Sequence, residues 1–341
     1  MALSNVSFSS TTYVPIIKSK KAELDALSGC NSPSLVPLIE VLEPVTAAAQ
    51  VTQAWNPDDV AWVQVLNPDG TEDAYFAAYV TNFFAELRFA GTYVPVITAT
   101  EEPDTLASIA EIMEMDERGV VIRIDVEELI DEGIDSVADI LGTIDALGTD
   151  PSHVDLVVDA GLLTGTAVVR AAVAGQAVQK LPTISAWRNV VLAFSAFPAQ
   201  LGEVAARETV TAIAREDAAA FITVRHTIDR DIIFSDYTVG VPTYGSAPFT
   251  PIPNMRYASD TEWYIHRGKE RKGPAEQYRK LASDIVESTY YSGPAYSPGD
   301  NRISEIAAKT SGPGNATTHL MIAVSRHIHV VLDRLATLGE P

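Results

Sequence analysis

The chain alternates between short apolar runs rich in β-branched residues and longer amphipathic segments, and this rhythm continues as far as residue 237. A short apolar, β-branched run bounded by turn signals is typical of a buried strand. We therefore predict eight strands, at residues 12–18, 36–42, 61–66, 92–98, 119–125, 154–159, 189–195 and 231–237.

The segments between these runs have the apolar spacing of helices, which predicts helices at residues 21–27, 45–54, 72–89, 104–115, 135–147 and 165–181. Residues 207–226 are predicted to be largely helical, either as one helix or broken into two. Strands that alternate with helices pair in parallel through βαβ units. Eight such strands favour an α/β fold of the (β/α)₈ TIM-like type over an open, doubly wound sheet. No Gly-rich dinucleotide fingerprint or P-loop follows a predicted strand, which also disfavours the open sheet. We therefore predict one barrel domain over residues 1–341.

The regular rhythm stops after residue 237. A Pro/Gly-rich stretch at 241–254 is followed by two short predicted strands, at 255–257 and 261–266, and by predicted helices at 275–289 and 319–338. Residues 240–315 are therefore predicted to form an insertion lobe after the eighth strand. We expect this lobe to cover the C-terminal mouth of the barrel, where the active sites of such enzymes lie.

Polar side chains lie near the C-terminal ends of the predicted strands. Arg123 and Asp125 are two residues apart, so they point to the same face of their strand, while Ile122 and Ile124 point to the other. The same alternation applied to every strand predicts a mouth lined by Lys18, Glu40, Gln64, Arg123, Asp125, Asp159, Ser195 and Asp236. Buried charges need partners, so this set is either a structural ion-pair network or a functional pocket. The number of charges collected favours the pocket.

These residue types permit several chemistries. The carboxylates of Glu40, Asp125, Asp159 and Asp236 could act as acid and base or bind a divalent cation such as Mg²⁺ or Mn²⁺. Lys18 and Arg123 could hold a phosphate or carboxylate, with Gln64 and Ser195 as further substrate contacts. A serine triad is disfavoured, because no histidine is predicted at a strand end. The insertion adds Arg256, Tyr257, Arg267 and Asp300, which could stack on a base or sugar and grip phosphate, or could be ordinary loop residues.

The composition narrows the function classes. Of 341 residues 47% are hydrophobic, and the net charge is −21, spread along the chain, which argues against non-specific duplex DNA binding and against nucleic-acid mimicry. The single cysteine, Cys30, excludes an internal disulfide and a cysteine-based zinc cluster. No signal-peptide pattern and no apolar run of membrane-spanning length is visible. We expect a soluble, cytoplasmic protein with no membrane partner.

An ordered set of motifs resembles the Beta protein family, described from bacteriophage and widespread in bacteria. The motifs are residues 13–16 with Lys18 and Glu23, 37–40, 121–123, Asp159, 187–188, 195–198, 235–237, 256–257, 267–268 and 298–300. The chain departs from the family pattern at Ser235, where a glycine is expected, and near His319, where adjacent Asn and His residues are expected. The resemblance adds Tyr237 to the substrate-binding positions. It implies no established activity.

Two functional hypotheses follow. The first is a hydrolase or lyase that acts on a phosphorylated or nucleotide-like substrate in the barrel mouth, for example a metal-dependent phosphoric-ester hydrolase. The second is a non-catalytic protein that binds a small anionic ligand or a partner protein in phage–host conflict. The substrate, the metal dependence and the oligomeric state do not follow from the sequence.

Overall fold

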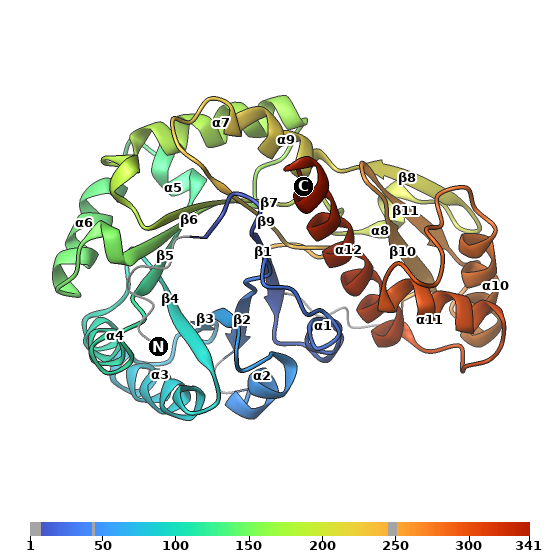
Figure 1. Cartoon of the computed structure of the whole chain (residues 1–341), viewed down its shortest axis with the longest axis horizontal. Helices are drawn as coiled ribbons and strands as arrows, with labels where there is room; N and C mark the ends of the chain where they lie inside the picture. The colour runs from blue at the N-terminus through green and yellow to red at the C-terminus, as the bar shows by residue number, and fades with distance from the viewer. Residues whose placement is uncertain (1–7, 43–44, 245–250) are drawn as a thin grey trace.

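Eight parallel strands close into a barrel in the computed structural model, which describes residues 8–42, 45–244 and 251–341 (Figure 1). Neighbouring strands pair in chain order, and the last pairs with the first. The strands are β1 Tyr13–Lys18, β2 Leu38–Leu42, β3 Val60–Leu66, β4 Thr92–Thr98, β5 Val120–Asp125, β6 Val154–Ala160, β7 Asn189–Phe194 and β9 Ile233–Asp236. The predicted (β/α)₈ architecture is confirmed.

Helices surround the barrel and carry the chain from each strand to the next. Asp135 caps α6 by accepting a hydrogen bond from the Ala138 backbone N–H, and Pro103 occupies the first turn of α4, where its missing N–H costs no hydrogen bond. The helices on the barrel are α1 Lys21–Leu27, α2 Ala48–Ala54, α3 Asp73–Arg88, α4 Pro103–Asp116, α5 Val126–Ile130, α6 Ser136–Ala146, α7 Ala167–Lys180 and α9 Glu216–Arg225. The short helix α8 Leu201–Val204 lies on the side of the lobe.

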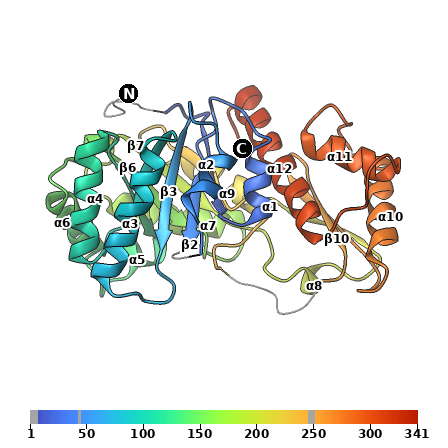
Figure 2. The same cartoon turned by 90° about the horizontal axis from the view of Figure 1, so that it is seen from below.

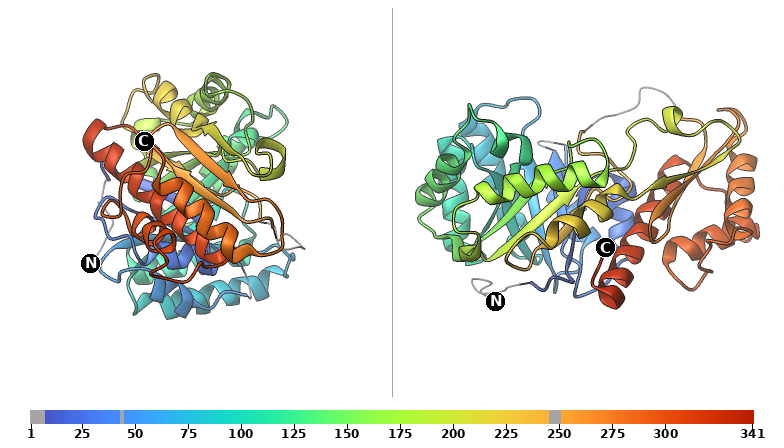
Figure 3. Two further views of the ribbon diagram at one scale, coloured as in Figure 1. Left: turned by 90° about the vertical axis from the view of Figure 1, so that its right-hand side faces the viewer. Right: turned by 90° about the horizontal axis from the view of Figure 1, so that it is seen from above.

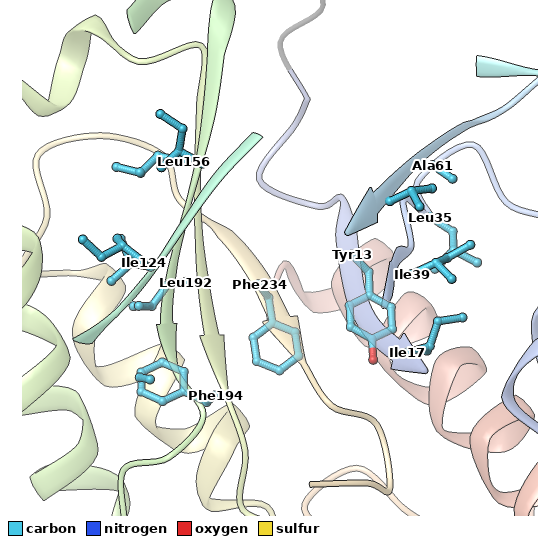
Figure 4. Close-up of a cluster of buried hydrophobic side chains, with 14 of the residues drawn as sticks. Tyr13, Ile17, Leu35, Ile39, Ala61, Ile124, Leu156, Leu192, Phe194 and Phe234 are labelled. Carbon is cyan, nitrogen blue, oxygen red and sulfur yellow. The ribbon is translucent and has the colours of Figure 1, made fainter. Parts of the chain in front are cut away.

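Two apolar layers lie on opposite sides of the barrel wall. Side chains such as Val14, Leu38 and Trp62 fill the interior. The outward side chains pack against the helices, and Figure 4 shows part of this layer, including Tyr13, Ile39, Leu156 and Phe234. The predicted alternation is confirmed for the first seven strands, whose inward apolar residues are Val14, Ile16, Leu38, Trp62, Val94, Val96, Val121, Val157, Val191 and Ala193.

The alternation predicted for the eighth strand is wrong. Ile233 and Tyr237 fill the barrel interior, whereas Phe234 lies in the outer layer and Asp236 bonds to groups outside the barrel. In the run of residues 231–237 both faces carry apolar and polar residues, so its pattern does not decide which face is inward. A shift of one residue exchanges the two faces of a strand.

The predicted insertion forms a lobe together with β8 Val210–Ala214, which precedes the last barrel strand. The three-stranded antiparallel sheet of the lobe has the order β10 Asn254–Ala258, β11 Glu262–Arg267 and β8. The helices α10 Pro274–Val286, α11 Pro298–Ala307 and α12 Ala316–Leu338 pack on one face of it (Figure 3). The helix predicted at 207–226 is wrong over β8. The β-branched residues of β8 alternate in burial at the sheet edge, and a helix, α9, begins only at Glu216.

The lobe sheet lies beside the barrel wall in both views of Figures 1 and 2. The part of the predicted insertion that lies over the mouth is its first segment, residues 240–244: the Val241 carbonyl oxygen accepts a hydrogen bond from Lys18, and the Tyr244 hydroxyl donates to the Glu40 carbonyl oxygen. Residues 245–250, which fall in the predicted loop at 241–254, lie outside the described residues. None of the described helices is long and apolar enough to cross a membrane.

The helix α12 belongs to both parts of the molecule. It packs against α1 and β1 of the barrel and against β10 and α11 of the lobe. Asn315 caps its start by accepting from the Thr318 backbone N–H, and Gly339 ends it with φ 68°, a left-handed conformation that glycine adopts without strain. One continuous helix therefore fixes the lobe to the barrel.

Candidate active site at the barrel mouth

A guanidinium group stands at the centre of the mouth. Arg123, on β5, donates from Nε and Nη2 to Asp159 Oδ2 at 2.9 and 2.6 Å, and from Nη1 to Glu40 Oε1 at 2.9 Å and Gln64 Oε1 at 2.6 Å. Its Nη2 also donates to the Tyr237 hydroxyl at 2.5 Å. Burial alone would lower the pKa of Arg123, but Asp159, Tyr237 and Glu40 together raise it. We call these five residues the mouth network.

Tyr237 and a glycine hold Asp159 in place. The Tyr237 hydroxyl donates to Asp159 Oδ2 at 2.5 Å, and the Gly161 backbone N–H donates to Oδ1 at 2.8 Å. A Cβ atom at Gly161 would lie 2.5 Å from the Tyr237 ring, so this position accepts only glycine without a shift. Burial, followed by the charge of Asp159, raises the pKa of Tyr237, so its phenol stays protonated at neutral pH.

Lys18 closes one side of the mouth. Its Nζ donates to the Val241 carbonyl oxygen at 2.5 Å and lies 4.0 Å from Glu40 Oε2. Burial lowers the pKa of Lys18, and its Nζ also lies 5.1 Å from the centre of the Tyr244 ring. Although the oxygen Glu40 Oε2 is buried, it accepts no hydrogen bond within the described residues. A ligand with a donor could therefore satisfy it.

Asp125, at the end of β5, is the mouth carboxylate that the network does not use. No hydrogen bond or ion pair to its side chain occurs in the described part of the chain, and it lines a cavity of about 390 Å³. Burial and the nearby Asp159 raise the pKa of Asp125 to about 6, against a smaller opposite effect of Arg123. Other residues that line the cavity are Glu40, Gln64, Asn67, Thr98, Arg123, Glu128 and Tyr244.

The family model for the Beta protein matches residues 13–333. The chain belongs to the Beta protein family. The match extends from the first barrel strand almost to the end of α12, so barrel and lobe both belong to the region that defines the family. The resemblance seen in the motifs is confirmed.

Curated protein sequences contain no match to this member of the Beta protein family. Among solved structures it is similar to a type I 3-dehydroquinate dehydratase from Clostridium difficile, with 13% identity over 68% of this chain and 87% of that one, at a TM-score of 0.39. It is also similar to a triosephosphate isomerase from Bartonella henselae, with 10% identity over 66% and 92% of the two chains and a TM-score of 0.36.

Two residues predicted for the mouth lie elsewhere. Asp236 points out of the barrel, where it accepts hydrogen bonds from Tyr13 at 2.5 Å and from His327 of α12 at 2.8 Å. Burial would raise the pKa of Asp236, but His327 and the nearby Arg215 lower it. Ser195 follows β7 and is buried, and its carbonyl oxygen accepts from Arg170, outside the mouth cavity.

The four residues predicted from the insertion are likewise not in the mouth. Tyr257 and Asp300 bond to each other in the core of the lobe at 2.9 Å, and Arg326 donates to Asp300 at 2.9 Å. Arg256 and Arg267 line a separate groove between lobe and barrel. The structure thus collects Lys18, Glu40, Gln64, Arg123, Asp125, Asp159 and Tyr237 at the mouth.

The sequence pattern did not predict several of the residues that line the mouth cavity. Tyr244 and Asn67 sit in loops, where no periodicity indicates a direction, and Glu128 lies on the short helix α5. Gly161 could have been noticed, because a glycine directly after a predicted strand often marks a close approach of backbone to another group. Within the described residues, no group of three or more His, Cys, Asp and Glu side chains is placed to hold a metal ion.

Proposed function

We propose that the barrel mouth is the active site of a hydrolase or lyase in which Asp125 exchanges a proton with a nucleotide-like substrate. The observation that carries the proposal is the position of this carboxylate. It lines the mouth cavity, and no described residue hydrogen-bonds to its side chain, while its neighbours are held by fixed hydrogen bonds. A group whose pKa is about 6 can both give and accept a proton near neutral pH.

The mouth network supports this role by fixing the surroundings of Asp125. Arg123 is already bonded to two carboxylates, so it orients Asp159 and Glu40 and holds their charge. Two acceptors in this cavity make no hydrogen bond within the described residues: the Asp125 carboxylate and Glu40 Oε2, which has Lys18 Nζ 4.0 Å away. Such acceptors suit the hydroxyl and amino groups of a sugar or a base. A phosphate of the same substrate would need cations outside this cavity.

The test is a screen for turnover with paired variants. Purified protein is offered phosphodiesters, phosphomonoesters and nucleosides, with and without Mg²⁺ or Mn²⁺, and the pH dependence of kcat/KM is recorded for each substrate that reacts. Asp125→Asn should lower kcat/KM by about 100-fold or more and abolish the pH limb near 6. Glu127→Gln is the matched control, because it removes an exposed carboxylate two residues away. Equal rates in the two variants contradict the proposal.

A second candidate is a non-catalytic protein that captures a small ligand or a partner in phage–host conflict. The observation that favours it is that the charged groups of the mouth network already pair with each other: Arg123 donates to both Glu40 and Asp159. No turnover across the screen, together with saturable binding of one of its compounds that Glu40→Gln weakens, decides for this candidate.

A further inference from the structure

A second, larger cavity lies at the junction of barrel and lobe, and we call it the junction groove. Its volume is about 830 Å³, and α1, α8, β10, β11 and the start of α12 contribute to its walls. In Figure 2, α1 and α12 lie between the barrel and the lobe, with β10 and α8 on the side of the lobe. Six basic residues line the groove, namely Lys20, Lys21, Arg207, Arg256, Arg267 and Arg271, and none of the described lining residues is acidic.

The groove is basic although the chain as a whole is acidic. The chain has 45 acidic residues and only 24 basic ones, and a quarter of the basic residues line this one groove. The carboxylate with the largest influence on Arg256 is that of Glu23, but its Oε2 accepts a hydrogen bond from the Lys18 backbone N–H at 2.5 Å. Like charges repel at close range, so a groove built this way is stabilised by an anion.

Backbone carbonyl groups hold two of the arginines in position, and neither arginine has a salt bridge to a carboxylate in the described part of the chain. Arg256 donates from Nη1 to the Val239 carbonyl oxygen at 2.7 Å, and its guanidinium lies 4.9 Å from the centre of the Phe197 ring. Arg267 donates to the Ala205 carbonyl oxygen. Burial lowers the pKa of Arg256 to about 10, so the side chain is still charged at neutral pH. A carbonyl oxygen carries no net charge, so these hydrogen bonds orient the guanidinium groups without cancelling their positive charge. The groups can therefore still bind an anion.

The start of α12 contributes further features. Ala316 and Thr317, in the first turn of this long helix, line the groove, and the N-terminal end of a helix dipole favours negative charge. His319, also in the wall, is buried and donates from Nε2 to the Pro313 carbonyl oxygen at 2.8 Å. Its Nδ1 has no partner within the described residues, so it is a free acceptor for a ligand hydroxyl.

We propose that the junction groove binds a small molecule that carries a chain of phosphates, such as a nucleoside triphosphate. Six cations spread along one cavity exceed what a single phosphate can engage, and the volume is within the range of small-molecule sites. The proposal goes beyond the function proposed for the mouth, and it stands even if the mouth is not catalytic. The two cavities are neighbours, because the Tyr244 ring that lines the mouth lies 5.1 Å from Nζ of Lys20 in the groove.

The test is calorimetric titration of the full chain with ATP, sodium tripolyphosphate and inorganic phosphate, at low salt and at 0.15 M salt. The variant is Lys21→Glu/Arg207→Glu, which reverses two exposed charges of the groove. The control, Lys180→Glu/Lys280→Glu, changes the net charge equally outside the groove. Lys280 is a close match for Lys21, because both are exposed and form an ion pair with an aspartate four residues later.

We expect ATP and tripolyphosphate to bind more tightly than phosphate, and the groove variant to lose affinity by about tenfold or more while the control stays within about threefold. Tighter binding of ATP than of tripolyphosphate assigns the groove to a nucleotide, and equal binding assigns it to the phosphate chain alone. A loss of affinity in the groove variant separates this result from the fate of the mouth, because neither Lys21 nor Arg207 lines the mouth cavity.

Three outcomes overturn the proposal: no binding by the wild type, equal losses in the two double variants, or binding of a short single-stranded oligonucleotide that ATP does not displace. If the double variant does not fold, Arg207→Ser serves in its place. Arg207 is exposed, and no hydrogen bond or ion pair to it occurs in the part of the chain that the structure describes. This single variant should still weaken ATP binding by about threefold or more, and an unchanged affinity contradicts the proposal.

Discussion

Replacing Arg123 by methionine would leave the buried Asp159 carboxylate without its counter-charge, and Glu40 with only Lys18, whose Nζ lies 4.0 Å away. The Glu40 and Asp159 side chains are 3% and 2% exposed, and Arg123 contacts both at hydrogen-bonding distance. Removing one partner of such a buried network costs about 3–5 kcal/mol, because the remaining charges stay desolvated. The unfolding entropy of globular proteins is about 2.1 cal/mol/K per residue, which for this chain is about 0.7 kcal/mol/K. Arg123→Met should therefore lower Tm by roughly 4–7 °C.

Calorimetric and urea unfolding of the wild type and Arg123→Met measure this loss. The control is the triple variant Arg123→Met/Glu40→Gln/Asp159→Asn, which also removes both negative charges. A buried ionic cluster replaced as a whole is often close to neutral in stability, so the triple variant should recover about half of the loss or more. A loss below about 1 kcal/mol in Arg123→Met, or a triple variant less stable than the single one, would refute the reasoning.

Three further predictions concern other parts of the molecule. Asp125 holds its proton more tightly in the folded state, because its pKa is about 6 there instead of 3.8. The free energy of unfolding should therefore fall as the pH rises from 4 to 6. Urea unfolding should show a weaker dependence of this free energy on pH in Asp125→Asn. Gly161→Ala should lower the free energy of unfolding by about 1–3 kcal/mol, because the added Cβ would lie 2.5 Å from the Tyr237 ring. Gly142→Ala, where the added Cβ on α6 meets no other atom, should raise this free energy by up to about 1 kcal/mol in the same assay. His327→Ala should lower the free energy of unfolding by about 1–3 kcal/mol, because the buried Asp236 carboxylate loses one donor and keeps only Tyr13, Arg215 and the Thr238 backbone N–H. Limited proteolysis should then cut the lobe faster, and unchanged cleavage contradicts the coupling.

The barrel could be predicted from the sequence because each unit is local. A buried parallel strand is a short apolar run, and its helix has a different period, so both appear in neighbouring residues. Residues such as Glu40 and Arg123 could be assigned to the mouth for the same reason, since alternation places them on the face opposite to the outer layer. The strand β8 was missed because it pairs with β11, about fifty residues further along the chain, and gains its partner only in the folded lobe.

The rest of the site depends on contacts between distant residues. Asp236 faces outward because His327 and Arg215 lie there to compensate its charge, and nothing in residues 231–237 records that arrangement. Arg256 and Arg267 were predicted to hold an anion at the mouth, but the antiparallel pairing of β10 and β11 directs them to the junction groove. The local sequence pattern thus predicts that these side chains bear charge for a site better than it predicts which site they line.

The contact between Asp236 and α12 has a consequence for the order in which the protein can form during synthesis. Asp236 ends the last barrel strand, yet its hydrogen-bond partner His327 follows 91 residues later. A ribosome releases those residues only after all eight barrel strands have emerged. Until then Asp236 has Tyr13 and Arg215 as partners but lacks the hydrogen bond from His327, so its burial costs more free energy. The last strand therefore docks less stably before α12 is available. Barrel closure is completed together with lobe assembly, and a nascent chain that stops before α12 is more open to proteases.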